Sequence, residues 1–439
     1  MIGRTDKRHE GDSMSRILIH IPMAAHGEYD IFSQFNHEKL LQFVSIDHNG
    51  VCPNLGNRLW FQGIISAIDC IDNQLEYFSP DMSKEYINDN FDLIVAPMAN
   101  IFSKGFVPIL WSLEERFREI KIPVYVIACG VQADSYDQLN AICNELRAPA
   151  SAFISSVYNT GGEFALRGYF TKEFFDRLGF SSAVVTGCPS MFQMGRNLHI
   201  SEEKVEKEEF RPLLNGDPSY YPELFSMYEN AEFFDQSIFF HELWDPAYLN
   251  DNDHDCLKKL IEKFGICTTT YLLQDRIKLI PDMNIWREYL IHKGFSLSYG
   301  SRIHGSIMPI LAGIPAVLEV RDARTKEMAE FFHIPCVSPG EYKKYESLYE
   351  LYRDIDYHAF NQGFTERYNN YEQFLRKHGI VRQIQEENGF FHPIKEIPAV
   401  SATCERRAEL FKRFMKENRY WNAYDRLYRV KQKITRYLG

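Results

Sequence analysis

Short apolar runs alternate with amphipathic stretches along most of the chain, and small-residue turns separate the two. The runs predict strands near 16–22, 91–97, 123–128, 164–168, 183–185, 236–241, 266–272, 295–299 and 316–320. Apolar positions at helical spacing predict helices near 37–44, 54–68, 106–120, 172–178, 255–264, 283–292, 303–311 and 326–332. Strands that alternate with helices in this way predict an α/β fold with parallel sheets.

The pattern also predicts the domain organisation, because 439 residues are enough for two domains or more. It weakens between 194 and 230, where charged, proline-containing and tyrosine-rich sequence reads as an interdomain connection with insertions. We therefore expect a polar, disordered tail at 1–15 and a first α/β domain at 16–193. We expect a connection at 194–234, a second α/β domain at 235–338 and a helical C-terminal extension at 339–439.

The second domain is organised around the stretch 300–318, which reads as a tight turn, a short helix at 303–311 and a strand. Gly313 is the expected C-terminal cap of this helix, and Pro309 inside it predicts a kink or an early end. Ligands bind at the carboxyl ends of parallel strands, beside helix N-termini whose free N–H groups attract anions.

Chemistry-bearing side chains stand at that point of the stretch. Arg302 offers a cationic fork for phosphate or carboxylate, and His304 titrates near neutral pH. Ser301 lies in the turn, and Gly305 leaves room for a ligand to approach the backbone. The alternative is structural, with Arg302 paired to a carboxylate and His304 capping a loop.

Further polar residues follow other expected strands or begin other expected helices. Arg167 repeats the logic of Arg302, because it ends a strand and precedes a helix for which Thr171 is the expected cap. Asn54 or Asn57 can cap the helix at 54–68, and Gly56 between them permits a close approach. The other residues that we expect to line a binding cleft are Asn100, Gln132, Thr186, Gly187, Asp322 and Arg324. The structural alternative for Gln132 is a loop residue in solvent, and for Asp322 and Arg324 it is an internal ion pair.

Composition excludes several function classes. The net charge of −11 argues against a nucleic-acid partner, because phosphate backbones attract clustered cations. Nine cysteines without a C-x-x-C pair indicate neither a zinc ribbon nor a redox dithiol, and they fit a reducing cytoplasm. No apolar run reaches the roughly 18 residues of a membrane span. No cluster has the spacing of metal ligands, so we expect no metal.

A basic, aromatic stretch near the C-terminus leaves two interpretations open. It is either a helix that rests on an anionic membrane surface or a solvated helix packed by its aromatic side. Its residues are Arg406, Arg407, Lys412, Arg413, Lys416, Arg419, Tyr420, Trp421, Tyr424, Arg426, Tyr428, Arg429, Lys431, Lys433 and Arg436.

The ordered motifs resemble those of the polysaccharide pyruvyl transferase family over roughly 54–337. They are Asn54-Leu55-Gly56-Asn57, the strand at 91–97, Gly130-Val131-Gln132, Leu166-Arg167, Thr186-Gly187-Cys188-Pro189, Ser301-Arg302-Ile303-His304-Gly305, Gly313-Ile314-Pro315-Ala316, Asp322-Ala323-Arg324-Thr325 and Ile334-Pro335. The resemblance implies two Rossmann-like domains that face a cleft, as in B-type glycosyltransferases. This chain differs from the family pattern at Asn57, where family members often have an acidic residue.

The resemblance implies transfer of pyruvate from phosphoenolpyruvate to a sugar or oligosaccharide, free or lipid-linked, as a cyclic ketal. Carried over, the donor-binding residues are Arg167, Arg302 and His304, with Ser301 and Gly305 beside them. Arg302 and His304 are the expected catalytic residues, and phosphoenolpyruvate is a co-substrate with no further cofactor. The implied setting is exopolysaccharide or capsule assembly in the cytoplasm, at the inner face of the membrane.

Two alternatives of another class stay open at this point. A glycosyltransferase of the same fold would use a nucleotide sugar, and Glu319 is the nearby carboxylate for the ribose. A non-catalytic relative would bind carbohydrate without releasing phosphate. Fold alone does not decide among the three.

Overall fold

The computed structural model describes residues 14–20, 55–69, 73–216, 222–236, 258–259, 261–262, 269, 276–278, 280, 282–381, 391, 409–410 and 412–413. The chain divides into two compact units, each described here by itself. Unit 1 comprises 1–26, 63–189 and 366–389, and unit 2 comprises 27–62, 190–365 and 390–439. Two of the boundaries, at 62/63 and 365/366, fall inside helices α3 (Leu55–Ile68) and α16 (His358–Lys377).

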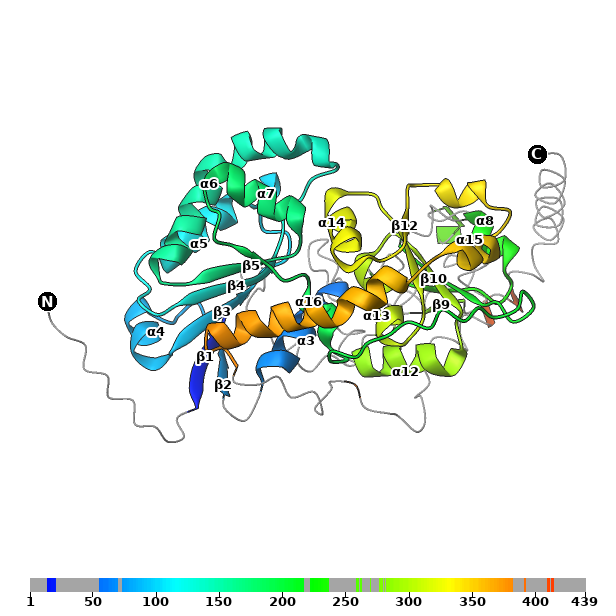
Figure 1. The fold of residues 1–439 in the computed structure, drawn as a ribbon, viewed down its shortest axis with the longest axis horizontal. Helices are drawn as coiled ribbons and strands as arrows, with labels where there is room; N and C mark the ends of the chain where they lie inside the picture. Colours follow the sequence, from blue (N-terminus) through cyan, green and yellow to red (C-terminus); the bar gives the residue numbers. More distant parts are fainter. Residues whose placement is uncertain are drawn as a thin grey trace, which may run out of the picture. The chain divides into compact units, whose positions relative to one another are not determined.

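Unit 1 is built on a six-stranded sheet with the order β2-β1-β3-β4-β5-β6, in which all neighbours are parallel (Figure 1). Its strands are β1 (Ser15–Ile19), β2 (Asn73–Tyr77), β3 (Leu93–Pro97), β4 (Val124–Cys129), β5 (Glu163–Leu166) and β6 (Val184–Val185). Every residue of β3 and β4 is buried, as expected of central parallel strands with both faces covered. The sequence pattern did not predict β2.

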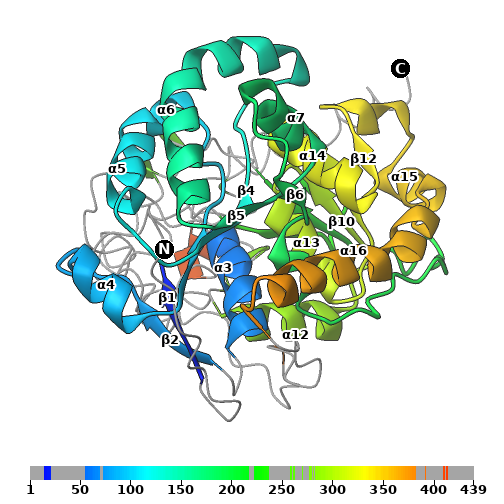
Figure 2. The ribbon, with the colours of Figure 1, turned by 60° about the vertical axis from the view of Figure 1, so that its left-hand side comes forward.

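The helices of unit 1 bury a phenylalanine-rich core. They are η1 (Lys104–Phe106), η2 (Tyr136–Gln138), α4 (Lys84–Asn90), α5 (Val107–Phe117), α6 (Leu139–Asn159) and α7 (Tyr169–Leu178), and α5 packs beside α6 (Figure 2). The rings of Phe102, Phe153, Phe164, Phe174 and Phe175 contact one another, so these aromatic residues form core. Sequence analysis missed α4 and α6.

Unit 2 has its own parallel six-stranded sheet, ordered β12-β11-β10-β7-β8-β9. Its strands are β7 (Pro212–Asn215), β8 (Glu232–Phe234), β9 (Ile277–Lys278), β10 (Leu297–Gly300), β11 (Ala316–Glu319) and β12 (Cys336–Val337). Counted from β7, this is the Rossmann order 3-2-1-4-5-6. The expectation that 194–234 is only a connection is therefore wrong, because β7 and β8 lie in it and β7 is central.

The helices of unit 2 include the one predicted at the centre of the stretch 300–318. They are α8 (Pro222–Met227), α12 (Met283–Lys293), α13 (Ile303–Leu311), α14 (Ala323–Phe332), α15 (Leu348–Asp354) and the 3₁₀ turn η5 (Glu341–Lys344). α13 has the predicted bounds, and Gly313 follows it with φ +80. The N–H of Gly313 bonds to the Ile310 carbonyl and that of Ile314 to the Pro309 carbonyl, which is a Schellman ending.

The region after 338 differs from the expected extension. α15 and α16 are helical as predicted, but residues 366–389 belong to unit 1, so α16 is part of both compact units. Most of the basic aromatic stretch lies outside the described residues, and so does the whole predicted helix at 37–44. The same holds for most of the predicted helix at 255–264 and for most of the predicted strands at 236–241 and 266–272. Among the described helices, none combines the length and apolar character needed to cross a bilayer.

Candidate functional site

In unit 2 the strand order reverses between β7 and β10, which are direct neighbours. In open α/β sheets, ligands bind at the carboxyl ends of the strands beside such a switch point. β7 ends at Asn215 and β10 ends at Gly300, and these two residues are paired across the strands. The predicted turn Ser301-Arg302 therefore begins at the switch point of the sheet.

The first turn of α13 presents the predicted cation and imidazole at this edge. Arg302 is the N-cap residue of α13, and it makes no side-chain capping bond. Ser301 and Arg302 are partly exposed, whereas His304 is buried at 6% exposure. Because the first N–H groups of a helix carry partial positive charge, Arg302 and this turn together favour an anion.

The N-terminus of α3 packs closely against His304. A Cβ atom on Gly56 would lie 2.7 Å from Nδ1 and 2.9 Å from Cβ of His304, and 2.6 Å from Nε2 of Gln236. The room at Gly56 is therefore filled by side chains of this chain. Asn57 lies inside the first turn of α3 and is exposed, so it does not cap the helix, and Asn54 lies outside the described residues.

Gly305 has a different role from the one expected. A Cβ atom there would lie 2.7 Å from Cγ and 2.9 Å from Oδ1 of Asn215. The close approach that requires glycine at this position is thus made by Asn215, and Gly305 leaves no room for a ligand on that side.

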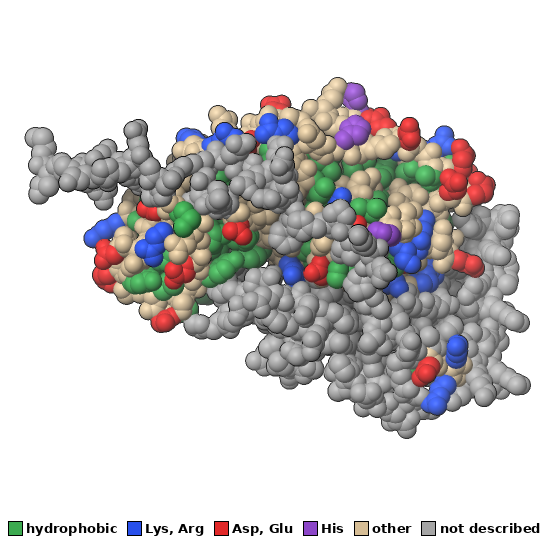
Figure 3. All heavy atoms as spheres, turned by 90° about the horizontal axis from the view of Figure 1, so that it is seen from below, with side chains coloured by type: hydrophobic (Ala, Val, Ile, Leu, Met, Phe, Trp, Pro, Cys, Tyr) green, Lys and Arg blue, Asp and Glu red, His purple; other side chains and the backbone are tan. Residues whose placement is uncertain are grey.

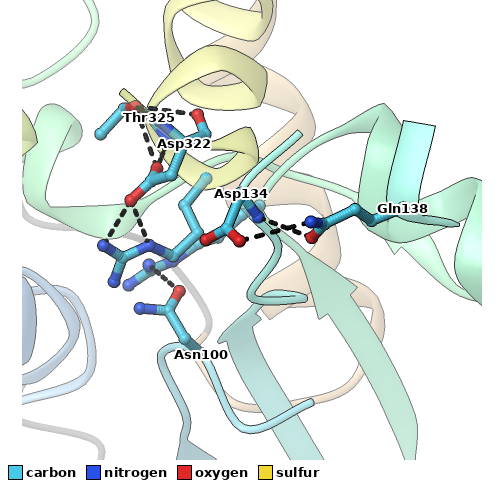
Figure 4. A network of polar contacts seen from close by, with 7 residues as sticks. Asn100, Asp134, Gln138, Asp322 and Thr325 are labelled. Atoms are coloured by element: carbon cyan, nitrogen blue, oxygen red, sulfur yellow. Dashed lines mark hydrogen bonds and ion pairs between the residues drawn. The ribbon is translucent and has the colours of Figure 1, made fainter. Parts of the chain in front are cut away.

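Unit 1 has a polar cluster of its own at the carboxyl ends of β3, β5 and β6. Arg167 follows β5 and is buried at 4% exposure. Its Nη1 donates to Oδ1 of Asn100, 3.0 Å away (Figure 4). Within the described part of the chain, its Nε and Nη2 have no hydrogen-bond partner. A buried guanidinium with two unpartnered nitrogens is costly, so this cluster suits a bound anion.

Thr186 and Gly187 complete this edge of unit 1. Both backbone N–H groups donate to the Leu166 carbonyl. The Thr186 hydroxyl is fully buried, and none of the described groups bonds to it. Ala128, at the end of β4, has φ 62 at a register shift of the ladder, which marks local strain.

One further sequence prediction for unit 1 is corrected, and another stays a prediction. Gln132, a candidate to line a cleft, has an exposed side chain after β4. Thr171 lies inside α7, whose N-cap is Gly168, and its hydroxyl accepts from the Val131 N–H. The tertiary contact to Val131 therefore takes the place of the expected cap.

Asp322 and Arg324 form the internal ion pair that was the structural alternative. Nη2 and Nε of Arg324 lie 2.6 and 3.0 Å from Oδ2 of Asp322, and Asp322 caps α14 through the Thr325 N–H (Figure 4). Burial raises the pKa of Asp322, but Arg324 and Thr325 outweigh it and hold that pKa below its ordinary value. These groups stabilise the start of α14.

Glu319 is also engaged within unit 2. Its Oε2 accepts from the Tyr299 hydroxyl at 2.7 Å and from the Gly340 N–H at 3.2 Å, and its Oε1 pairs with Arg321. The carboxylate is fully buried, so it is not presented to a nucleotide ribose.

Sequence reasoning missed Asn215, Gln236 and Arg58. Asn215 ends the short apolar run Pro212-Leu213-Leu214 before Gly216, a pattern typical of a buried strand bounded by a turn. Arg58 is buried on α3, and this burial lowers its pKa to about 10 against the opposing effect of Asp282. No periodicity marks a lone buried arginine, so only the structure identifies it.

Among the described residues, no group of histidine, cysteine, aspartate and glutamate side chains could hold a metal ion. The model of the polysaccharide pyruvyl transferase family matches residues 54–322, which is more than half of the chain. The chain therefore belongs to the polysaccharide pyruvyl transferase family. No curated protein matches its sequence significantly.

Several solved structures are similar to this chain at low identity. A UDP-N-acetylglucosamine 2-epimerase has 10% identity and TM-score 0.40, with 85% of this chain and 99% of that chain covered. The UDP-GlcNAc 2-epimerase of Neisseria meningitidis, bound to UDP-GlcNAc, has 14% identity and TM-score 0.39, with 82% and 100% covered. The glycosyltransferase SnogD of Streptomyces nogalater has 10% identity and TM-score 0.31, with 82% and 95% covered.

Proposed function

We propose that this member of the polysaccharide pyruvyl transferase family transfers pyruvate from phosphoenolpyruvate to two hydroxyls of a sugar, as a cyclic ketal. One observation supports this above all. Arg302 and His304 stand together on the first turn of α13, at the switch point of the unit 2 sheet. A cation, helix N–H groups and an imidazole at one point suit a donor that carries phosphate and carboxylate.

The chemistry needs a proton donor and stabilisation of the leaving group. C3 of phosphoenolpyruvate takes a proton, and C2 becomes an oxocarbenium-like centre that a sugar hydroxyl attacks. The C2–O bond to phosphate breaks, and phosphate leaves with the electron pair. A second hydroxyl then closes the ring, and both hydroxyl protons are released to a base or to the departing phosphate. His304 is our proposed acid, and Arg302 would stabilise the phosphate.

Arg167 is the further cation that we propose for anion binding. Its unpartnered Nε and Nη2 would gain charge-assisted hydrogen bonds from a phosphate or carboxylate. Family membership suggests a sugar or oligosaccharide acceptor, free or lipid-linked, in polysaccharide assembly. A cytoplasmic setting is part of the same proposal.

The nucleotide-sugar alternative has less support from this chain. It would use Glu319 for the ribose, but Tyr299, Gly340 and Arg321 occupy that carboxylate. The non-catalytic alternative differs in predicting sugar binding without phosphate release.

Calorimetry with phosphoenolpyruvate tests the proposal directly. We expect the wild type to bind it and Arg302→Ala to lose at least tenfold in affinity. Arg324→Ala is the matched control, because Arg324 pairs with Asp322 at the next helix of the same unit and should keep wild-type affinity. No binding to the wild type at millimolar ligand, with or without a sugar acceptor, would contradict the proposal.

His304→Ala tests the catalytic role separately. We expect phosphoenolpyruvate binding to be retained in part, while phosphate release in the presence of an acceptor falls by about 100-fold or more. Wild-type release by this variant would show that His304 is not the acid.

A further inference from the structure

One buried side chain of unit 2 bonds to both ends of the turn that carries Arg302 and His304. Asn215 is fully buried at the end of β7. Its Oδ1 accepts from the Arg302 N–H at 3.0 Å, and its Nδ2 donates to the Gly305 carbonyl at 3.1 Å. The amide therefore spans the first turn of α13, from the N-cap residue to the third helical residue.

Pro309 explains why the Gly305 carbonyl accepts a side chain. In an α-helix this carbonyl would bond to the N–H four residues later, but proline has no N–H. The early end that Pro309 could cause does not occur, since α13 continues to Leu311. Nδ2 of Asn215 and, at 3.3 Å, Oγ of Ser298 take the place of the missing donor.

The two glycines that flank the Arg302–His304 segment are also fitted to Asn215. A Cβ atom on Gly300 would lie 1.9 Å from the Asn215 carbonyl oxygen, and one on Gly305 would lie 2.7 Å from Asn215 Cγ. Both contacts are closer than a real Cβ atom can make. Gly300 thus makes room for the backbone of Asn215, and Gly305 makes room for its side chain.

We propose that Asn215 is a positioning residue that fixes the first turn of α13 and so orients Arg302 and His304 toward the donor. The inference rests on the proposed function for its catalytic consequence. Both halves of the amide are used, one as acceptor and one as donor, so a carboxylate of the same shape cannot replace it. Asn215 is not proposed to contact the substrate. It acts by holding the turn through the Arg302 N–H and the Gly305 carbonyl.

Steady-state kinetics of Asn215→Asp and Asn215→Ala test the consequence. We expect kcat/KM for phosphoenolpyruvate to fall by about 10- to 100-fold, with kcat reduced as well as KM raised, because small misplacements of catalytic groups are costly. Asn230→Ala is the matched control. It removes another asparagine-to-carbonyl bond, from Nδ2 of Asn230 to the Phe210 carbonyl, at the opposite end of the same sheet, and should retain wild-type kinetics.

Pro309→Ala supplies a rescue that a merely structural asparagine would not show. The new N–H at 309 can bond to the Gly305 carbonyl, so adding Pro309→Ala to Asn215→Ala should restore part of the lost kcat. It should not restore all of it, since the Arg302 N–H still lacks its acceptor. Pro309→Ala alone should keep wild-type kinetics.

Hydrogen exchange of the peptide covering 301–310 gives a readout independent of turnover. We expect exchange in Asn215→Ala to rise in this peptide, and Pro309→Ala to reverse part of the rise. An active wild type whose kinetics survive folded Asn215→Asp and Asn215→Ala would overturn the positioning role alone. If the wild type does not use phosphoenolpyruvate, the proposed function fails, and unchanged exchange in Asn215→Ala would then overturn the inference as well.

Discussion

At Arg167, effects on stability and on ligand binding can be measured separately. The described residues offer no hydrogen-bond partner to two nitrogens of its buried guanidinium. Arg167→Met keeps the length and apolar volume of the side chain but removes the uncompensated polar group. We expect the free energy of unfolding to stay equal or to rise by about 1 kcal/mol, because the desolvation cost disappears. We also expect phosphoenolpyruvate affinity to fall at least tenfold, as measured by calorimetry beside urea unfolding.

Arg177→Met is the control for this substitution. Arg177 lies on α7 of the same unit and pairs at the surface with Glu173 and Asn140, so its loss should change stability little and affinity not at all. A large loss of stability in Arg167→Met, with affinity retained, would show that Arg167 is a structural arginine.

His20 makes unit 1 sensitive to acid. It follows β1 and stacks on Phe78 with ring centroids 4.5 Å apart, and no described side chain bonds to either ring nitrogen. Burial, assisted by the nearby Arg116, lowers the pKa of His20 to about 3. Below pH 6.5, the ordinary pKa of histidine, His20 is protonated in the unfolded chain but stays neutral in the folded chain. The contribution of neutral His20 to the free energy of unfolding is therefore full above pH 6.5 and is lost as pH falls toward 3.

His20→Gln should therefore reduce the dependence of stability on pH. Between pH 7 and pH 5, the wild type should lose about 2 kcal/mol of unfolding free energy through His20, and the variant should not lose this part. Urea unfolding at both pH values measures the difference, in which any cost of the substitution itself cancels. Equal losses in the two proteins would contradict the prediction.

At the scale of elements, the sequence predicted α13 at its observed bounds because local signals decide both of its ends. Gly313 adopts the left-handed conformation after the helix, and polar residues with a tight turn precede it. Continuation through Pro309 could not be predicted in this way, since it depends on Asn215, more than ninety positions earlier in the chain (309 minus 215). The ends of this helix follow from the local sequence, whereas its continuation past a proline depends on a tertiary hydrogen bond.

The missed strands have a similar explanation. β7 is a four-residue strand and β8 a three-residue strand, so neither shows a period long enough to recognise among charged neighbours. Because β7 lies at the switch point, missing it also hid Asn215 from the candidate site. The family and the α/β class were nevertheless evident, since they follow from many motifs and from the overall alternation.

The cap of α14 offers a test at this scale. Asp322→Ala removes the bond to the Thr325 N–H and the pair with Arg324, and should cost about 1–2 kcal/mol of unfolding free energy. Since the folded pKa of Asp322 lies below its ordinary value, this contribution should be full at neutral pH and fade as the carboxylate is protonated in acid. Thermal unfolding at pH 7 and pH 3 measures both effects, because the ordinary pKa of Asp322 is 3.8 and the folded value lies below it. We expect phosphoenolpyruvate affinity to be unchanged, and a tenfold loss would return Asp322 to the ligand site.

At the scale of the whole molecule, the charge is opposite to what an anionic donor would favour at long range. The chain carries a net charge of −11, and cationic and anionic side chains are interspersed on the face drawn in Figure 3. If the proposed function holds, we expect the attraction of phosphoenolpyruvate to come from short-range groups such as Arg302 and the first N–H groups of α13. Specific contacts of this kind discriminate among anions by shape, which makes ligand-induced stabilisation a sharp test of function.

A ligand that binds only the folded chain raises its stability by mass action, by about 2.7 kcal/mol at 100 times its dissociation constant. We therefore expect phosphoenolpyruvate to raise the unfolding temperature of the wild type and to leave that of Arg302→Ala nearly unchanged. UDP at the same concentration should have little effect, because the buried Glu319 is held by Tyr299 and Gly340. A shift with UDP and none with phosphoenolpyruvate would instead favour a nucleotide-sugar enzyme on the same two-sheet fold. Arg324→Ala removes a different cation and keeps α13 intact, so it should follow the wild type with both ligands. This control shows whether the loss of Arg302 itself, rather than the loss of any one positive charge, abolishes the shift.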